Sequence, residues 1–192
     1  MITIDLPQTR KDRRIALRLL QDYAKEHPGE DFWEPTIKDV DPKPGAKKKI
    51  PMLIYKDKVV VGLAETMIGM AGGKVGSYGL ATLYIKKQYR GQGLSSEVYR
   101  ICNQMAKAMN FDFFVQIWYP DFVQYKEKFV KLGFVYAIKV GLLEEDGLES
   151  TTKFVVGIMF NKQDECPAVR IDSIPNTVSK TGLFSMFNEP QH

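Results

Sequence analysis

The sequence predicts an α/β fold, and three stretches carry that prediction. Residues 80–85 form a short β-favouring run that leads through a glycine-containing loop into a long helical pattern. Residues 51–68 contain two β-favouring runs around a short polar turn, as a β-hairpin does. Residues 111–118 are again β-favouring and precede a second helical stretch at 122–132. Together these stretches predict a single domain in which helices pack on a sheet.

The composition indicates an ordinary globular protein. The chain has 192 residues, 44% of them hydrophobic and 26% charged, which suits one domain with a sizeable core. Its net charge of +4 is too small to predict nucleic-acid binding by itself. The sequence has no apolar run of about 20 residues, the length of a membrane span, and its two cysteines predict no disulfide framework. We therefore expect a cytoplasmic protein. Because the only histidines are His27 and His192, neither a histidine-based metal site nor a Ser-His-Asp triad is expected.

The first 27 residues predict a strand and a basic helix. Ile2 to Ile4 form a short strand candidate that ends at Pro7, and Thr9 suits the N-cap of a helix running to about Lys25. The apolar face of this helix consists of Ile15, Leu19, Leu20 and Tyr23. Five basic residues lie mostly elsewhere on it: Arg10, Lys11, Arg13, Arg14 and Arg18. A basic face can meet an acidic substrate or a nucleic acid, but a solvated surface is the commoner explanation.

The loop at residues 86–93 has an arrangement that binds phosphate. It follows the strand at 80–85 and precedes a helix with an apolar stripe at Leu94, Val98, Ile101 and Met105. Glycines let the backbone approach a ligand closely, and the first turn of a helix directs N–H groups and the positive end of its dipole outward. The loop has no G-K-[ST] of a P-loop, and Ser96 stands where a dinucleotide-binding motif has its third glycine. A merely structural turn is the alternative, which the flanking strand and helix disfavour.

The pattern Gln88-x-x-Gly91-x-Gly93 resembles the Q/R-x-x-G-x-G/A motif of the GCN5-related N-acetyltransferase (GNAT) family, which binds the pyrophosphate of acetyl-CoA. The resemblance covers about Ile2 to Asn161 and implies the GNAT (acyl-CoA N-acyltransferase) fold, a mixed, mostly antiparallel sheet of six to seven strands flanked by helices. It further implies an acyl-CoA-dependent N-acyltransferase that uses acetyl-CoA as co-substrate and no metal. The acetyl group would pass to a primary amine by direct attack.

The resemblance also implies which residues hold the cofactor. Strand backbone near Leu83, Tyr84 and Ile85 would pair with the amides of the pantetheine arm, and its N–H groups would polarise the thioester carbonyl. The loop and the first helical turn would hold the pyrophosphate through Gln88, Tyr89, Arg90, Gly91, Gln92, Gly93, Leu94, Ser95 and Ser96. Cys102, on the following helix, is interpreted as a packing residue.

Two regions are candidates for the acceptor side of such a site. Glu65 lies near the end of the apolar second strand of the hairpin, where a carboxylate with a raised pKa can take a proton from the incoming ammonium. The alternative, which we favour, is that Glu65 points to solvent on the other face of the strand. Between the first strands, the resemblance makes Phe32 and Trp33 candidates for lining the acceptor pocket, although such residues are more often simply core.

The second helix differs from the family signature at the position of the proton-donating tyrosine. Residues 128–134, KFVKLGF, resemble the family signature L-Y-E-K-L-G-F. The family tyrosine that often protonates the CoA thiolate falls on Phe129, which has no hydroxyl, and the family asparagine falls on Phe122. Tyr125, one turn earlier on the same face, and Tyr119, in the preceding turn, are the candidate acids. The alternatives are that each is a buried structural tyrosine, or that water protonates the thiolate.

The end of the chain predicts a closing strand pair and an arm. Residues 134–143 and 152–160 are expected to pair around an acidic turn at 144–147, which completes a GNAT-like domain at residues 1–161. Residues 162–192 are expected to form a C-terminal arm that packs on the domain or on a partner, so a homodimer or a protein partner is open. The apolar segment Leu183 to Phe187 suits either role.

Two functions stay open at this point. The intact glycine loop favours acetyl transfer, whereas the phenylalanine at the tyrosine position favours a catalytically weak or inactive GNAT-fold module that acts through protein–protein binding. Nucleic-acid binding rests on net charge and the basic helix only, and is not expected. The sequence does not identify the amine acceptor.

Overall fold

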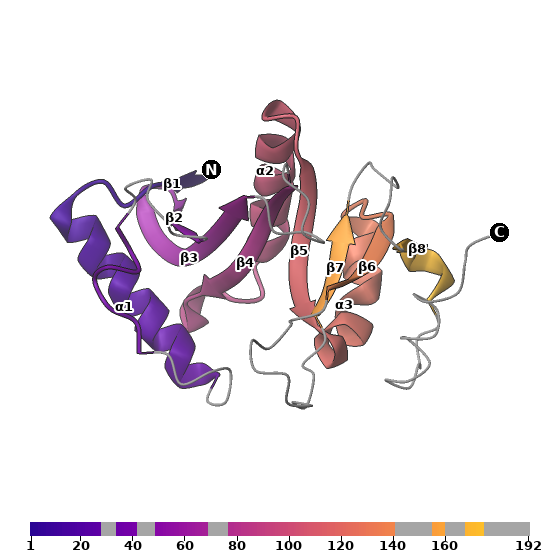
Figure 1. Cartoon of the computed structure of the whole chain (residues 1–192). Coiled ribbons are helices and arrows are strands. Elements are labelled where there is room, and N and C mark those ends of the chain that lie inside the picture. The colour runs from indigo at the N-terminus through magenta and orange to yellow at the C-terminus, as the bar shows by residue number, and fades with distance from the viewer. Residues whose placement is uncertain (28–33, 42–48, 69–76, 141–154, 160–167, 175–192) are drawn as a thin grey trace, which may run out of the picture. The chain divides into compact units, whose positions relative to one another are not determined.

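The computed structural model describes residues 1–27, 34–41, 49–68, 77–140, 155–159 and 168–174 (Figure 1). Phe32 and Trp33, the acidic turn at 144–147 and the apolar segment at 183–187 lie outside these residues. The chain forms two compact units, one from Met1–Ile68 and Leu80–Gln104, the other from Gly69–Gly79 and Met105–His192. None of the helices among the described residues is long and apolar enough to cross a membrane.

Helix α1 (Arg10–Glu26) follows strand β1 (Ile2–Asp5) in the first unit. Its predicted N-cap is confirmed: Asp12 N–H donates to Thr9 Oγ1 at 3.1 Å, and Thr9 N–H donates to the Asp12 carboxylate at 3.0 Å. This capping box satisfies two N–H groups at the end of the helix. The hydrogen bonds from Thr9 also lower the pKa of Asp12. The helix ends at Glu26, one residue beyond the predicted Lys25, and His27 is its C-cap.

The sheet of the first unit has the strand order β1-β2-β3-β4, with β2 at Ile50–Lys56, β3 at Val59–Ile68 and β4 at Ser77–Ile85. Strands β1 and β2 are antiparallel, as are β2 and β3, so the predicted hairpin is confirmed. Strand β4 runs antiparallel to β3, because Lys86 N–H donates to the Val61 carbonyl at 2.9 Å while Thr82 contacts Glu65 further along both strands. Strand β4 begins at Ser77 rather than at the predicted Leu80.

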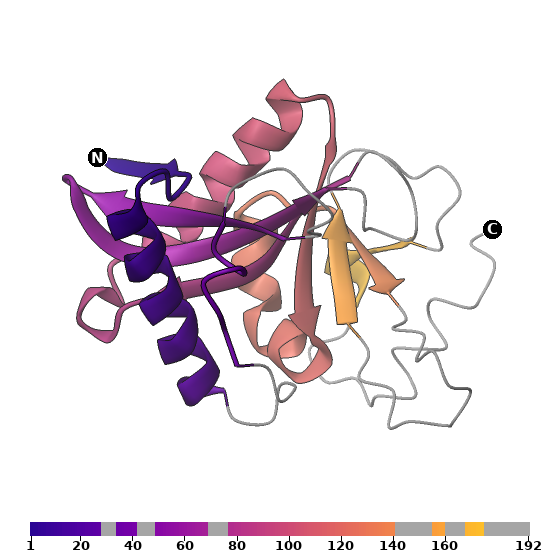
Figure 2. The same cartoon turned by 60° about the vertical axis from the view of Figure 1, so that its left-hand side comes forward.

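Helix α1 lies across one face of these strands (Figures 1 and 2) and closes the core of the first unit. Its apolar stripe meets the strands through a cluster of buried residues. The cluster consists of Ala16, Leu19, Leu20, Val40, Leu53, Leu63 and Tyr84. This helix therefore buries the side-chain face of β4 that carries Tyr84, directly before the glycine loop.

Gly62 fixes the distance between β3 and β4. A Cβ at this position would lie 2.3 Å from the Tyr84 carbonyl oxygen and 3.2 Å from the Ile85 Cα. Both contacts are with backbone, which cannot rotate away as a side chain can. Gly62→Ala is therefore expected to lower the free energy of unfolding by about 1–3 kcal/mol, measured as a lower urea midpoint with an unchanged slope. An unchanged midpoint would show that β3 and β4 can move apart to accommodate the methyl group without a loss in the free energy of unfolding.

The second unit contains the continuation of helix α2 (Leu94–Ala108) and a sheet with the strand order β5-β7-β6-β8. These strands span Asp112–Trp118, Val155–Met159, Tyr136–Val140 and Ala168–Arg170, respectively. All three pairings in this sheet are antiparallel, which confirms the predicted closing pair β6 and β7. The described residues contain eight strands in total, β1 to β8, and β8 is the addition to the predicted six to seven.

Helix α3 (Tyr119–Lys131) begins three residues before the predicted Phe122. The prediction of a turn at Tyr119 to Asp121 was wrong because a proline fits the first turn of a helix, where its missing N–H needs no partner. The helix ends at Lys131, one residue before the predicted end at 132. Gly133 N–H then donates to the Val130 carbonyl at 2.9 Å, while Phe134 N–H donates to the Phe129 carbonyl at 3.0 Å. These two bonds form a Schellman motif.

The start of the predicted C-terminal arm packs on its own unit. Strand β8 pairs with β6, and the buried Lys126 donates to the carbonyl of Ile174. Ile171 and Ile174 are themselves buried. Residues 168–174 are therefore held to the second unit by backbone pairing, by a lysine and by apolar contacts.

Candidate functional site

The glycine loop lies where the sequence placed it, between β4 and α2. A short 3-10 turn, Lys87–Tyr89, leaves β4. Gly91 and Gly93 then adopt φ values of 76° and 74°, in the left-handed region that favours glycine. A Cβ on either glycine would meet no atom within 4 Å among the described residues. The glycines are thus required by backbone conformation, and the space beside them is open to a ligand.

Helix α2 begins directly after these glycines. Glu97 N–H donates to the carbonyl of Gly93 at 3.2 Å, which closes the first helical turn. The N-terminal turn of a helix directs its N–H groups and the positive end of the dipole out of the helix. Leu94, the first residue of this turn, is buried, while Gly91 to Gly93 are exposed. The open space beside the loop therefore lies at a helix terminus that favours an anion.

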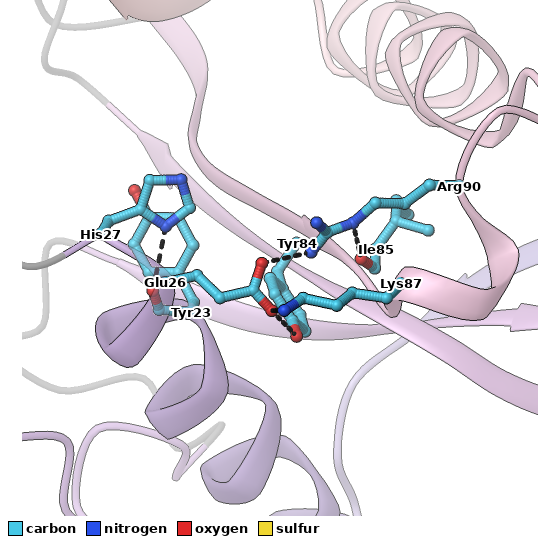
Figure 3. A network of polar contacts seen from close by, with 7 residues as sticks. All are labelled: Tyr23, Glu26, His27, Tyr84, Ile85, Lys87 and Arg90. Atoms are coloured by element: carbon cyan, nitrogen blue, oxygen red, sulfur yellow. Dashed lines mark hydrogen bonds and ion pairs between the residues drawn. The ribbon is translucent and has the colours of Figure 1, made fainter.

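The C-terminal end of α1 is joined to the glycine loop by a network around Glu26 (Figure 3). The Glu26 carboxylate accepts hydrogen bonds from Arg90 Nη2 at 2.7 Å and from Tyr84 Oη at 2.8 Å. The Lys87 ammonium lies 3.7 Å from the same carboxylate. Arg90 Nε donates to the Ile85 carbonyl at 2.8 Å, and its guanidinium lies over the Tyr84 ring at 5.4 Å. Glu26 thus connects α1, the end of β4 and the loop.

In this network the side chains of two predicted cofactor residues, Arg90 and Tyr84, bind other protein groups. Arg90 hydrogen-bonds to protein groups through both its Nε and its Nη2. Burial and the hydrogen bond to Glu26 raise the pKa of Tyr84 to about 12, so its hydroxyl keeps its proton at neutral pH. The backbones of both residues still stand beside the predicted cofactor position, while their side chains hold the loop against α1.

A second set of side-chain contacts also holds the loop. Lys56 Nζ, at the end of β2, donates to Gln92 Oε1 at 2.7 Å. Gln92 Nε2 in turn donates to the Gln88 carbonyl at 3.5 Å. The side chains of Gln88 and Gln92 are exposed, and that of Tyr89 is half-buried. The loop is thus held by two sets of side-chain contacts, while Gln88 and Gln92 stay exposed.

If the loop binds acetyl-CoA as the resemblance implies, Glu26→Gln is expected to weaken that binding several-fold, because the loop loses the charge-assisted bond from Arg90. The hydrogen bond from Arg90 lowers the pKa of Glu26 below its ordinary 4.5. The contact is therefore complete above the ordinary value, and is lost as pH falls through the lowered pKa. Acetyl-CoA titrations of the wild type should show this acid loss, and those of Glu26→Gln should lack it. Asp172→Asn, which removes an exposed carboxylate paired with Arg170, is the matched control.

Glu65 is buried, with 1% of its surface exposed, so the favoured expectation that it points to solvent was wrong. Thr82 Oγ1 donates to Glu65 Oε2 at 2.6 Å, and the Lys49 ammonium lies 3.9 Å from the same oxygen. Seven consecutive residues of β3, Val61 to Met67, are buried, so alternation along this strand does not separate a solvent face from a core face. The carboxylate is held in place close to β4, and a fixed position is what a general base needs.

The predicted acids lie in the second unit. Tyr125 is 45% exposed, whereas Phe129 is buried and packs edge-to-face on Phe134 at 5.5 Å. The residue at the family tyrosine position is thus a core residue, and Tyr125 one turn earlier has a different environment. Tyr119 is the first residue of α3, and its side chain lies outside the described ones. Their roles as proton donors stay predictions.

Neither a reactive thiol nor a metal site adds to this site among the described residues. Cys102 is buried, and burial raises the pKa of its thiol to about 12, which confirms the interpretation as a packing residue. Among the described residues, no group of three or more His, Cys, Asp or Glu side chains is placed to hold a metal ion.

Sequence reasoning missed three residues of this site: Glu26, Lys56 and Thr82. Glu26 and Arg90 are 64 positions apart, and no local pattern links them. Thr82 had a signal, because it lies two residues before Tyr84 and therefore on the same side of β4. A polar residue on the buried side of a strand needs a hydrogen-bond partner, and Glu65 is that partner.

The chain is similar to solved acetyltransferase structures, although no protein-family model and no curated protein matches it. One is an acetyltransferase from Thermus thermophilus, with 16% identity, a TM-score of 0.54, and 83% of this chain and 96% of that chain covered. A spermidine N-acetyltransferase, SpeG, from Vibrio cholerae has 14% identity, a TM-score of 0.57 and coverage of 83% and 92%. The PaiA N-acetyltransferase from Thermoplasma acidophilum, in complex with coenzyme A, has 10% identity, a TM-score of 0.52 and coverage of 83% and 99%.

These likenesses, at 10–16% identity, concern the arrangement of helices and strands. The predicted resemblance is confirmed at that level. The elements that align with these structures belong to a mostly antiparallel sheet with flanking helices, and 83% of this chain is covered in each comparison. The chain therefore has the fold of the GNAT acetyltransferases.

Proposed function

We propose that the protein is an acyl-CoA-dependent N-acetyltransferase that moves the acetyl group of acetyl-CoA to a primary amine. The observation that carries the proposal is the pair of left-handed glycines, Gly91 and Gly93, which open the loop at the N-terminus of α2 on a GNAT fold. A neighbour of the same fold was solved with coenzyme A, and another is a spermidine N-acetyltransferase, whose named acceptor is a polyamine. Both support acetyl-CoA as co-substrate and an amine as acceptor.

In this proposal the pyrophosphate binds the backbone of residues 89–96, with the α2 dipole behind it. The pantetheine arm pairs with the backbone of Leu83 to Ile85, whose N–H groups polarise the thioester carbonyl. The neutral amine attacks the carbonyl carbon, the C–S bond breaks, and CoA leaves as a thiolate. Catalysis then comes mainly from holding two substrates in one geometry.

Three proton transfers accompany this reaction: the substrate nitrogen loses one proton before the attack and a second, to water, as the tetrahedral intermediate becomes the amide, and the CoA thiolate gains one. Glu65 is the proposed acceptor of the proton lost before the attack, directly or through water, because its carboxylate is fixed beside β4. Tyr125 or Tyr119 is the proposed donor to the thiolate, with water as the alternative. No step requires a metal.

The first experiment is a calorimetric titration of the purified protein with acetyl-CoA, with CoA as the comparison. Micromolar binding followed by release of free thiol in the presence of an amine panel, spermidine included, supports the enzyme. Binding without turnover supports the second candidate, a GNAT-fold module that acts through protein contacts, which the buried Phe129 favours. Absence of binding by the folded protein overturns the assignment of acetyl-CoA.

Tyr125→Phe tests the acid. If Tyr125 protonates the thiolate, the variant is expected to lose about 100-fold in kcat with little change in acetyl-CoA affinity, since general acid catalysis contributes at least that much. Tyr136→Phe, a half-buried tyrosine on β6 of the same unit, is the matched control. A wild-type kcat in Tyr125→Phe would remove Tyr125 from the mechanism.

A further inference from the structure

The first unit has a cavity that the proposed acetyl transfer does not use. It has a volume of about 520 Å³ and lies along the N-terminal half of α1, where the helix faces the start of β3 and Lys86. Its apolar lining includes Ile15, Leu19, Val59 and Val60. Five of the lining residues are basic: Arg10, Lys11, Arg14, Arg18 and Lys86.

The cavity concentrates the positive charge of the chain. Its five basic residues face one acidic lining residue, Asp22, which leaves an excess of +4. The whole chain has 27 basic and 23 acidic residues, an excess that is also +4. Basic and acidic residues elsewhere in the chain are therefore equal in number, whereas the lining of this cavity is strongly basic.

The three arginines that line the cavity have no carboxylate partner among the described residues. Within the described part of the chain, no carboxylate oxygen lies within 4.0 Å of the guanidinium of Arg10, Arg14 or Arg18. Arg13, which does not line the cavity, contrasts with them: it lies 3.8 Å from the Asp41 carboxylate and donates to the Gln8 carbonyl. The arginines of the cavity are thus available to an external anion.

The spacing of these arginines destabilises the protein when no ligand is bound. Arg10, Arg14 and Arg18 follow one another at four-residue intervals in α1, and like charges at that spacing destabilise a helix. Arg10 and Lys11 also lie in the first turn, where the positive end of the helix dipole disfavours a cation. A bound anion would reverse both effects.

We propose that this cavity binds a small polyanion, a compact molecule with two or more clustered phosphate or carboxylate groups. Arginine pairs with either group through two parallel hydrogen bonds, which suits a row of guanidinium groups. The volume falls in the range of pockets for small molecules, roughly 300–1,000 Å³, and the apolar residues leave room for a carbon skeleton. The ligand is distinct from acetyl-CoA, which occupies the glycine loop in the proposed function.

The test compares tripolyphosphate and citrate as probes, by titration and thermal denaturation at low ionic strength. Wild-type protein is expected to bind at least one of them and to unfold at a higher temperature in its presence; the tighter probe identifies the anionic group. Arg14→Gln/Arg18→Gln should weaken that binding at least tenfold, and without ligand should unfold at the same or a higher temperature than wild type. Arg100→Gln/Arg170→Gln, which removes two exposed arginines outside the cavity, should bind as wild type does.

Three results would overturn the proposal. The first is that the wild type binds neither probe, and the second is equal binding by Arg14→Gln/Arg18→Gln. The third is tighter binding of a single-stranded oligonucleotide than of either probe, lost in the same variant, which would make the cavity part of a nucleic-acid surface.

A second comparison separates this cavity from the acetyl-CoA site. Gly91→Asp is expected to bind the probe normally while failing to bind acetyl-CoA, and Arg14→Gln/Arg18→Gln is expected to show the reverse. Loss of both ligands in both variants would mean one continuous site and would overturn a separate one. If the wild type does not bind acetyl-CoA at all, the proposed function fails, but the probe titrations still decide the cavity.

Discussion

Gly91→Asp is expected to weaken acetyl-CoA binding by about a hundredfold or more. The new carboxylate would extend from a position whose surroundings are open, into the space assigned to the pyrophosphate. Juxtaposed like charges cost several kcal/mol, and each 1.4 kcal/mol is a factor of ten in affinity, so about 3 kcal/mol gives the expected loss. Calorimetric titration with acetyl-CoA measures it.

The control for this variant is Gly91→Asn. Gly91 has a φ of 76°, and both asparagine and aspartate tolerate that region better than other side chains do. The two variants have nearly the same shape and share any backbone strain, so they differ mainly in charge. A large loss in Gly91→Asp with a small loss in Gly91→Asn would identify an anion at this position. Equal losses would attribute the effect to loop conformation alone, and equal retention would contradict the assignment of the loop.

Glu65→Gln is expected to reduce kcat for acetyl transfer by about 100- to 10,000-fold, the range of general base catalysis. Glutamine keeps an oxygen that can accept the hydrogen bond from Thr82, so the variant should fold and should bind acetyl-CoA as wild type does. It loses the ability to take a proton from the substrate ammonium. The measurement is kcat for acetyl transfer with acetyl-CoA and the amine both saturating, beside a calorimetric titration with acetyl-CoA that checks binding.

The comparison that isolates this role is Thr82→Val. It removes the hydroxyl that donates to Glu65 but leaves the carboxylate in place. We expect it to retain much more of the wild-type kcat than Glu65→Gln does, because the proposed proton acceptor is still present. If Glu65→Gln and wild type have the same kcat, Glu65 is a structural residue, buried by packing and held by Thr82 and Lys49.

The local elements can be predicted from the sequence alone, because each depends on residues close together in the chain. Thr9 and Asp12 specify the start of α1 through a capping box that spans four residues. The glycines at 91 and 93 specify the loop through backbone conformations that other residues rarely adopt. Gly133 and the pair Phe129 and Phe134 end α3 in the same local way. Periodicity, capping and positive φ values are short-range effects, and so they can be read without the fold.

Which side chains contact one another depends on how distant elements pack, and this is visible only in the folded protein. Alternation along β3 predicts two faces, but not that both are covered, and the coverage is what buries Glu65. The hydrogen bond from Arg90 to Glu26 and the row of arginines beside Lys86 depend on where α1 lies across the sheet. That position is fixed by the burial of Leu19 and Leu20 against strands far away in sequence. Apolar burial is non-directional, so a sequence shows that α1 must be covered, and only the packed structure shows what covers it.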